Sequence, residues 1–360
     1  MSLDLTVIIP TYKEEEIIAP TLYEINSILK RTDISFEILI VDDNSPDKTG
    51  KIVQEVSAFF PVRLITRTAD PGLSQSVIEG FAQARGDVIV VTDADQSHDL
   101  LLIPEMYREC KTHDIVNGSR YMKGGHIKDW PFKRRIISLG ATFLARLLFP
   151  SVTDPVSGFF AVKRNLVSHA SLTPCGYKIL LEVLGKSCWH TIKELPYTFQ
   201  NRAYGESKLK TKTIIDFVRH LWSIAHFPGR AREEIRKMKM FAVVGISGIF
   251  VNTIALAMFK EWFGFPLLGA SFVAIELSIV SNFLLNDRLT FKDNKTHNPW
   301  LHRLLSFNGI SIGGMIINMS SLMLLSFLGV YYLIANLASV PIGFLWNFLW
   351  NRKITWGVKK

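Results

Sequence analysis

Residues 86–95 read Gly-Asp-Val-Ile-Val-Val-Thr-Asp-Ala-Asp, and this stretch decides the fold of the N-terminal part. The run from Val88 to Thr92 is short, apolar and rich in β-branched residues, which is typical of a strand buried on both faces of a parallel sheet. Asp93 and Asp95 follow it directly. Open α/β sheets bind ligands beyond the carboxyl ends of their strands, so the two carboxylates stand where a binding site is expected.

The same pattern occurs three times before residue 86. Each apolar run is followed by a segment of helical length, so that strands and helices alternate. This order predicts an α/β domain with a mostly parallel, Rossmann-like sheet and right-handed crossovers. The expected strands are Leu5–Pro10, Glu37–Val41 and Val62–Thr66, and the expected helices are Glu15–Lys30, Thr49–Phe60 and Leu73–Arg85.

Carboxylates follow these strands. No glycine-rich loop does, which excludes a dinucleotide fingerprint and a P-loop. Mg²⁺ and Mn²⁺ take one or two carboxylates and share their other positions with phosphate oxygens. Such a metal neutralises the charge that grows on a diphosphate leaving group. An isolated Asp-x-Asp pair is often only a solvated strand end. After this strand, and with Asp42 and Asp43 upstream, it indicates a nucleotide-sugar transferase of the GT-A fold.

The C-terminal third has a different composition. The 360 residues are 48% hydrophobic, and residues 304–351 contain no Asp, Glu, Lys or Arg. Each long apolar stretch can span about 30 Å of hydrocarbon at about 1.5 Å per residue. Four transmembrane helices are therefore predicted, which excludes a purely soluble or a disordered chain. The expected spans are Met240–Phe259, Trp262–Asn286, Leu304–Leu328 and Val330–Asn351.

The flanks of these spans predict the orientation. Thirteen Lys and Arg residues, in groups of five, four and four, lie on one side, and Lys260 alone lies on the other. The positive-inside rule places the N-terminal domain and the C-terminus in the cytoplasm of a multi-pass protein of the cell membrane. Three cysteines without a CxxC pair indicate neither a disulfide framework nor a zinc site, in agreement with a reducing compartment. Because membrane topology explains thirteen basic residues, the net charge of +9 needs no nucleic-acid partner.

The membrane part contains an internal repeat. Residues 282–291, Asn-Phe-Leu-Leu-Asn-Asp-Arg-Leu-Thr-Phe, match residues 347–356, Asn-Phe-Leu-Trp-Asn-Arg-Lys-Ile-Thr-Trp, which predicts two helical hairpins in parallel orientation. The domain is interpreted as an anchor, with small residues such as Gly313 and Gly314 available for pairing with a second copy. Alternatively, Glu276, Asn252 and Asn318 line a path for a polar headgroup, since ionisable residues inside a membrane are functional candidates. A structural, hydrogen-bonded Glu276 is an equal alternative.

Taken together, the motifs resemble the polyprenyl-phosphate (dolichyl-phosphate) mannose synthases, which are family 2 inverting glycosyltransferases. The four-helix half is similar to the anchor that some members of that family carry. The matching stretches are 10–14, 41–47, 72–73, 86–87, 93–95, 118–121, 133–138, 154–159 and 202–209. The resemblance implies an α/β GT-A domain at residues 1–210, an interfacial segment at 211–239 and a transmembrane domain at 240–360.

The resemblance also implies roles for individual residues. The nucleotide sugar is bound by Pro10, Tyr12, Glu14, Val41, Asp43, Asp93, Ala94, Asp95, Lys178, Arg202 and Lys208. Asp93 and Asp95 bind Mg²⁺ or Mn²⁺, with the third ligand open between Gln96 and Ser97 and assigned here to Ser97. Asp95, Arg120 and Arg134 are expected to be catalytic, and Arg120, Arg134 and Ser138 to hold the acceptor phosphate.

Two amphipathic segments bear on the acceptor. Lys133–Leu148 and Thr213–Phe227 place apolar residues opposite polar ones, as in helices that lie in a membrane interface, although core-facing helices would show the same pattern. At the interface, Arg120 and Arg134 would meet a lipid phosphate, which the planar guanidinium binds bidentately. A prenyl monophosphate is already anionic, so its oxygen attacks the anomeric carbon without a general base. We interpret His98 as structural.

The expected reaction is transfer of mannose from GDP-mannose to a polyprenyl monophosphate, with inversion. Transfer of glucose or an aminosugar from UDP to undecaprenyl phosphate is the alternative that keeps the fold. A processive polysaccharide synthase is disfavoured, because no base and no later Gln/Arg-rich motif is found. A transporter or flippase whose soluble domain senses the donor is the alternative from another class, and loss of turnover in Asp95→Ala would exclude it.

Overall fold

The computed structural model describes residues 3–173, 178–200, 211–294 and 298–357. It divides into two compact units, Met1–Glu234 and Ile235–Lys360. The boundary lies inside helix α9 (Arg230–Ala257), a few residues before the start of the predicted transmembrane domain. Each unit is described by itself.

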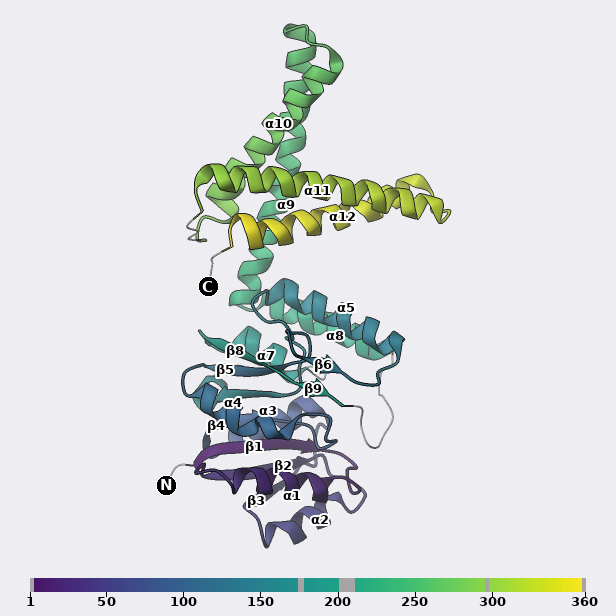
Figure 1. Cartoon of the computed structure of the whole chain (residues 1–360). Coiled ribbons are helices and arrows are strands. Elements are labelled where there is room, and N and C mark those ends of the chain that lie inside the picture. Colours follow the sequence, from purple (N-terminus) through teal and green to yellow (C-terminus); the bar gives the residue numbers. More distant parts are fainter. Residues whose placement is uncertain (1–2, 174–177, 201–210, 295–297, 358–360) are drawn as a thin grey trace. The chain divides into compact units, whose positions relative to one another are not determined.

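The first unit contains a seven-stranded sheet with the order β3-β2-β1-β4-β7-β5-β8 (Figure 1). The four predicted strands are confirmed as β1 to β4, and the sheet is mostly parallel, with β7 antiparallel to both of its neighbours. The strands are β1 (Leu3–Thr11), β2 (Phe36–Asp42), β3 (Val62–Thr66), β4 (Gly86–Val91), β5 (Ile115–Ser119), β7 (Phe160–Lys163) and β8 (Ile192–Pro196). A separate two-stranded ladder joins β6 (His126–Ile127) to β9 (Thr198–Phe199).

The three predicted crossover helices are confirmed with shorter bounds, and they cover the sheet. Alternate residues of the central strands, such as Val7, Ile9 and Val90, are fully buried in one core with Leu22 of α1 and Met106 of α4. The helices are α1 (Ile18–Leu29), α2 (Thr49–Ser57), α3 (Leu73–Gln83), α4 (Ile103–Cys110), α6 (Arg164–Ser168) and α7 (Ile179–Lys186). Burial of this continuous apolar surface supplies the main stabilisation of the unit.

Two further helices, α5 (Phe132–Leu148) and α8 (Thr211–His226), lie together at the β8 side of this unit (Figure 1). Both keep large apolar side chains exposed, so they are not simply core-facing: Phe132, Ile136, Leu139, Phe143 and Leu144 on α5, and Ile215, Val218 and Trp222 on α8. Helices that lie in a membrane interface carry such exposed apolar faces, and the interfacial position of α5 and α8 stays a prediction.

Helix α8 is attached to α7 by a buried contact between His220 of α8 and the Glu182 carboxylate of α7. The Nε2 atom of His220 lies 2.8 Å from Oε1 of Glu182, and Nζ of Lys186 lies 2.7 Å from Oε2 of the same carboxylate. Gly185 faces Ile224 so closely that a Cβ atom at position 185 would overlap the Ile224 side chain. The Ile224 side chain of α8 therefore packs directly against the backbone of α7, beside the buried Glu182 carboxylate.

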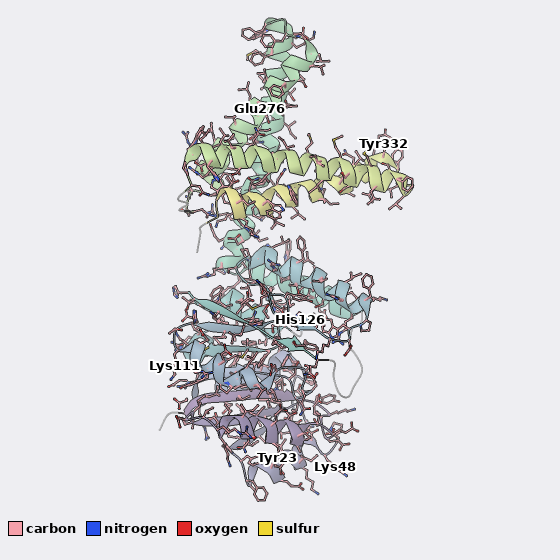
Figure 2. All side chains as sticks on the ribbon, viewed as in Figure 1. Tyr23, Lys48, Lys111, His126, Glu276 and Tyr332 are labelled. Carbon is pink, nitrogen blue, oxygen red and sulfur yellow. The ribbon has the colours of Figure 1, made fainter. Side chains whose placement is uncertain are left out.

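The second unit contains the four predicted transmembrane helices. Helices α9, α10 (Leu267–Leu285), α11 (Trp300–Phe327) and α12 (Tyr332–Trp350) are long and apolar enough to cross a membrane. Tyr332 begins α12, and Glu276 lies on α10 (Figure 2). Its Oε2 atom accepts a hydrogen bond of 2.9 Å from Nδ2 of Asn308 on α11, in agreement with a structural role for this glutamate.

The sequence repeat is also present in the structure, where residues at equivalent positions of the two hairpins pack in one aromatic cluster. The aromatic cluster of this unit consists of three pairs whose members are 65 or 66 positions apart: Phe241 and Phe307, Phe283 and Phe348, and Phe291 and Trp356. The last pair stacks with ring centroids 4.3 Å apart. Each hairpin also ends in a π-helical turn, η3 (Asn286–Thr290) or η4 (Asn351–Thr355), in which the threonine hydroxyl donates to the asparagine side chain.

Repeat-related glycines provide room for asparagines. Gly248 of α9 faces Asn282 of α10, and Gly314 of α11 faces Asn347 of α12. Gly313 faces Trp346 in the same way. The space at Gly313 and Gly314, which we expected to serve pairing with a second copy, is thus filled by α12 of the same chain.

Candidate active site

A cavity of about 540 Å³ opens at the carboxyl ends of β1, β2 and β4. One end is polar and is lined by Tyr12, Glu14, Asp43, Asp93 and Asp95. The cavity continues between α5 and α8, where its wall is apolar and includes Ile137, Ala141, Leu144, Phe217 and Val218. A ligand that fills it therefore meets carboxylates at one end and a lipid-like surface at the other.

The two carboxylates of the Asp-x-Asp pair differ in exposure. Asp93 is partly exposed, whereas Asp95 is buried and accepts a hydrogen bond from the backbone N–H of Ser97 at 3.1 Å. The structure also separates the two open candidates for a third metal ligand. The amide of Gln96 contacts Glu24 of α1 at 3.4 Å, whereas the Oγ atom of Ser97 is buried without a hydrogen-bond partner among the described residues.

The Asp43 carboxylate, predicted to hold the nucleoside, is engaged within the protein. It accepts hydrogen bonds from the backbone N–H of Gly72 at 2.7 Å and the hydroxyl of Ser76 at 2.8 Å, and it pairs with Arg67. These bonds hold the start of α3 against the end of β2. Asp43 lines the cavity, but its carboxylate is bound by residues of the protein itself. Val41, also predicted to hold the nucleoside, is fully buried inside β2, pairs with residues of both neighbouring strands and does not line the cavity.

His98 is held in a way that agrees with the predicted structural role. Its Nδ1 atom accepts the backbone N–H of Asp93 at 3.2 Å, and its ring stacks on Phe159 with centroids 5.0 Å apart. Burial lowers the pKa of His98 below its ordinary value, against the opposing effect of Asp93. Because Nδ1 is occupied as an acceptor, the remaining ring nitrogen, Nε2, carries the proton of the neutral imidazole and cannot serve as a base.

The predicted acceptor-phosphate residues all line the cavity, in different settings. Arg120 is buried and forms a bidentate pair with Asp154, with Nε–Oδ2 at 2.7 Å and Nη2–Oδ1 at 2.8 Å. This pair outweighs the effect of burial and raises the pKa of Arg120 further above its ordinary value. Arg134 and Ser138 lie one turn apart on α5, and the Ser138 hydroxyl accepts a hydrogen bond of 2.9 Å from Tyr121.

The structure describes some of the other residues that were predicted to bind the nucleotide sugar. Pro10, Ala94 and Lys178 line the cavity together with Tyr12 and Glu14. Arg202 and Lys208 lie outside the described residues. Trp130 is one of several cavity residues that belong to none of the sequence motifs. Its ring contacts Arg134, and no local pattern could have identified it because the contact depends on how α5 follows the preceding loop.

A mostly parallel sheet with an Asp-x-Asp pair at its carboxyl edge, opening into a cavity with basic and apolar walls, defines a glycosyltransferase of the GT-A type. Residues 6–170 match the family described as glycosyl transferase family 2, and residues 240–356 match the GtrA/DPMS transmembrane domain. These matches cover the two parts that the sequence separates by composition.

One curated relative matches over both parts, and another matches over 61% of the chain. The dolichol-phosphate mannosyltransferase of Pyrococcus furiosus is 42% identical over 355 residues, which cover 98% of this chain and 99% of that protein. The dolichol-phosphate mannosyltransferase of Saccharomyces cerevisiae is 36% identical and covers 61% of this chain and 86% of that protein. The chain belongs to the dolichol-phosphate mannosyltransferase family and is a membrane-bound glycosyltransferase.

A solved structure of lower similarity was also found. Glucosyl-3-phosphoglycerate synthase from Mycobacterium tuberculosis, in complex with Mn²⁺, uridine diphosphate and phosphoglyceric acid, is 19% identical with a TM-score of 0.48. The match covers 63% of this chain and 80% of that chain.

Proposed function

We propose that the protein transfers mannose from GDP-mannose to a polyprenyl monophosphate, giving polyprenyl-phosphate β-mannose and GDP. The observation that carries this proposal is the continuity of the cavity, which joins the carboxylates at the strand ends to the apolar walls of α5 and α8. A nucleotide sugar matches the polar end, and a prenyl chain with a phosphate head matches the remainder.

The acceptor phosphate lies against α5 in this proposal. Arg134 and Ser138 offer a cation and a hydroxyl on the same helical face, and the buried Arg120 adds positive charge behind them. Two of the five N–H groups of Arg120 are used by Asp154, which leaves three for other partners. The prenyl chain then follows the apolar walls near Leu144 and Val218 towards the membrane.

The chemical step needs no general base. A phosphate monoester is largely ionised at neutral pH, because its second pKa is about 6. One phosphate oxygen attacks the anomeric carbon from the side opposite the diphosphate, a C–O bond forms, and the bond to the leaving oxygen breaks with its electron pair going to GDP. No proton is transferred, in agreement with the neutral, hydrogen-bonded state of His98. Catalysis rests on positioning and on charge stabilisation.

Asp93 and Asp95, with Ser97, are the residues that would hold a divalent cation. Two carboxylates and an orphaned buried hydroxyl fit Mg²⁺ or Mn²⁺, which take few protein ligands and share the rest of their shell with phosphate oxygens. Among the described residues no group of three or more His, Cys, Asp or Glu side chains could hold a metal ion. In this proposal the donor diphosphate supplies further ligands. When bound, the metal offsets negative charge on the diphosphate. We assign Lys178, Arg202 and Lys208 to the same diphosphate.

In this proposal, donor and acceptor meet on the cytoplasmic side of the membrane. The thirteen Lys and Arg residues that flank the spans support a cytoplasmic catalytic domain and C-terminus. The exposed apolar faces of α5 and α8 support insertion of these helices at the lipid interface, where a phosphate headgroup lies.

A transfer assay in detergent tests the proposal. Purified protein is incubated with a polyprenyl phosphate, Mn²⁺ or Mg²⁺, and radiolabelled GDP-mannose or UDP-glucose in parallel. We expect labelled lipid from GDP-mannose alone, abolished by EDTA and restored by added metal. Label from UDP-glucose alone would retain the mechanism and overturn the donor.

Asp95→Ala separates catalysis from transport. Loss of one preorganised charge-stabilising group typically costs about 10²–10³-fold in rate. We therefore expect at least this loss of labelled product, with an unchanged elution profile on size exclusion. Full turnover in this variant would show that Asp95 has no catalytic role.

A further inference from the structure

The aromatic ring of Trp130 lies in the wall of the cavity, next to two arginines that also line it. The Cζ atom of Arg134 is 4.1 Å from the ring centroid, and that of Arg120 is 5.8 Å from it. Trp130 also packs edge-on against Phe199, with ring centroids 5.2 Å apart. All four residues line the cavity. Two positively charged guanidinium groups thus lie over the same indole ring, at the place where the acceptor phosphate is expected.

The stack acts on Arg134 without using its hydrogen bonds. An aromatic ring binds the face of a guanidinium, whereas a phosphate binds its N–H edge. Arg120 is oriented differently, because Asp154 takes two of its edge donors. Trp130 therefore restricts the rotamers of Arg134. It contacts the face of the guanidinium, whereas a phosphate binds the fork at its edge.

Space filling alone does not explain an indole at this position. The Nε1–H of Trp130 is buried and has no hydrogen-bond partner in the described part of the chain, which carries a desolvation cost. A phenylalanine would fill much of the same space without that cost. What tryptophan adds is the strongest π face among the side chains for a cation.

We propose that Trp130 is the positioning residue for the acceptor phosphate: its ring holds the Arg134 guanidinium in the orientation that binds the phosphate of the lipid. This inference rests on the proposed function, since it names a prenyl phosphate as the ligand. It predicts that Trp130 governs the KM for the acceptor and has little influence on the KM for the donor.

The chain contains a matched control in a second arginine–tryptophan stack. The Cζ atom of Arg230 lies 4.0 Å from the Trp189 ring, and neither residue lines the cavity. Trp189→Leu removes a stack of nearly the same geometry at a distance from the chemistry. Because Trp189 also donates a hydrogen bond to the Leu184 carbonyl, this substitution is the harsher one for stability.

The experiment measures acceptor and donor KM, kcat and Tm for Trp130→Phe, Trp130→Leu and Trp189→Leu, with a polyprenyl phosphate in detergent. We expect Trp130→Leu to raise the acceptor KM about tenfold, and Trp130→Phe about threefold, because cation–π contacts span this range and Phe has the weaker ring. Donor KM and kcat should change less than about twofold. Trp189→Leu should lower Tm at least as much and leave the acceptor KM unchanged.

A double variant tests whether the effect passes through Arg134. Lysine at position 134 keeps the charge but lacks the planar fork, so Trp130→Leu should raise the acceptor KM less than about threefold in an Arg134→Lys background. An unchanged acceptor KM in Trp130→Leu, an equal rise in both backgrounds, or the same rise in Trp189→Leu would overturn the inference. If Trp130→Leu does not fold, the Phe variant decides by the same criteria. Failure of the wild type to label any prenyl phosphate would instead overturn the proposed function, and this inference with it.

Discussion

Arg120 and Arg134 line one cavity but depend on different partners. Arg120 is buried and paired with Asp154, whose carboxylate is fully buried and also accepts the backbone N–H of residue 120 at 3.1 Å. Arg134 lies against the face of Trp130. The first arginine is therefore part of the folded core, whereas the second is oriented by a ring at the cavity wall.

At this scale we expect Asp154→Asn to be strongly destabilising. Removing one partner of a buried ion pair leaves an uncompensated charge and costs about 3–5 kcal/mol. The free energy of unfolding, measured by urea titration in detergent, should fall by that amount. Asp87→Asn serves as control, because its pair with Arg164 is exposed and should contribute less than about 1 kcal/mol. Equal effects of the two variants would contradict the prediction.

At the scale of elements, the attachment of α8 to α7 depends on the charge of Glu182. Burial raises the pKa of this carboxyl, but hydrogen bonds from His220, Lys186 and the N–H of Thr173 lower it by more, to below its ordinary value of 4.5. A depressed pKa in the folded state means that the carboxylate stabilises the fold fully above pH 4.5. This contribution is lost as the pH falls through the lower, folded-state pKa.

Glu182→Gln should therefore lower Tm at pH 7 and flatten the fall of Tm on acidification below pH 4.5. The change removes the buried negative charge that pairs with Lys186 and accepts hydrogen bonds from His220 and the N–H of Thr173, so a loss of about 3 kcal/mol is expected. Glu55→Gln is the matched control, since its pair with Lys51 is exposed. Thermal unfolding, scanned from pH 7 down to well below pH 4.5, measures both variants. An acid limb with the wild-type slope in Glu182→Gln would argue against this role.

The transmembrane hairpins are built on repeated glycine–asparagine contacts. A Cβ atom at Gly248 or Gly314 would overlap the side chain of Asn282 or Asn347, whereas Gly245 and Gly309 on the same helices face open space. Gly248→Ala and Gly314→Ala should each destabilise the membrane domain by about 1–3 kcal/mol through overpacking. Gly245→Ala and Gly309→Ala should be neutral or slightly stabilising, since alanine is the better helix former.

Thermal unfolding in detergent measures these four variants side by side. Because the two hairpins are repeats, Gly248→Ala and Gly314→Ala should lower Tm to a similar extent. A drop confined to one hairpin would show that the sequence repeat does not extend to its energetics.

For the whole molecule, the distribution of Lys and Arg predicts that both hairpins enter and leave the membrane on the cytoplasmic side. Single cysteines can test this in a variant that lacks Cys110, Cys175 and Cys188. A membrane-impermeant maleimide added to intact cells should label Lys260→Cys. It should label Lys292→Cys only after the membrane is permeabilised. The reverse pattern would place the catalytic domain outside.

Much of this architecture is predictable from short stretches of sequence. The strands ending at Thr11, Asp42 and Val91 follow from β-branched runs, and the four membrane helices follow from their length and lack of charge. The Asp93–Asp95 pair identifies the ligand end of the sheet because position after a strand fixes position on its edge. All of these features depend on residues that are neighbours in the chain.

The tertiary structure decides which partner each side chain has. Asp43 is bound by Gly72 and Ser76, Arg120 by Asp154, and Gly314 is covered by Asn347; in each case the two partners are 29 or more positions apart. No periodicity or composition encodes such pairings, because they arise when separate elements pack and each buried polar group must find an acceptor or donor. The sequence by itself therefore determined the order of the elements and the edge of the sheet at which the cavity opens. Only packing decided which charged groups pair with one another inside the fold, as Arg120 does with Asp154.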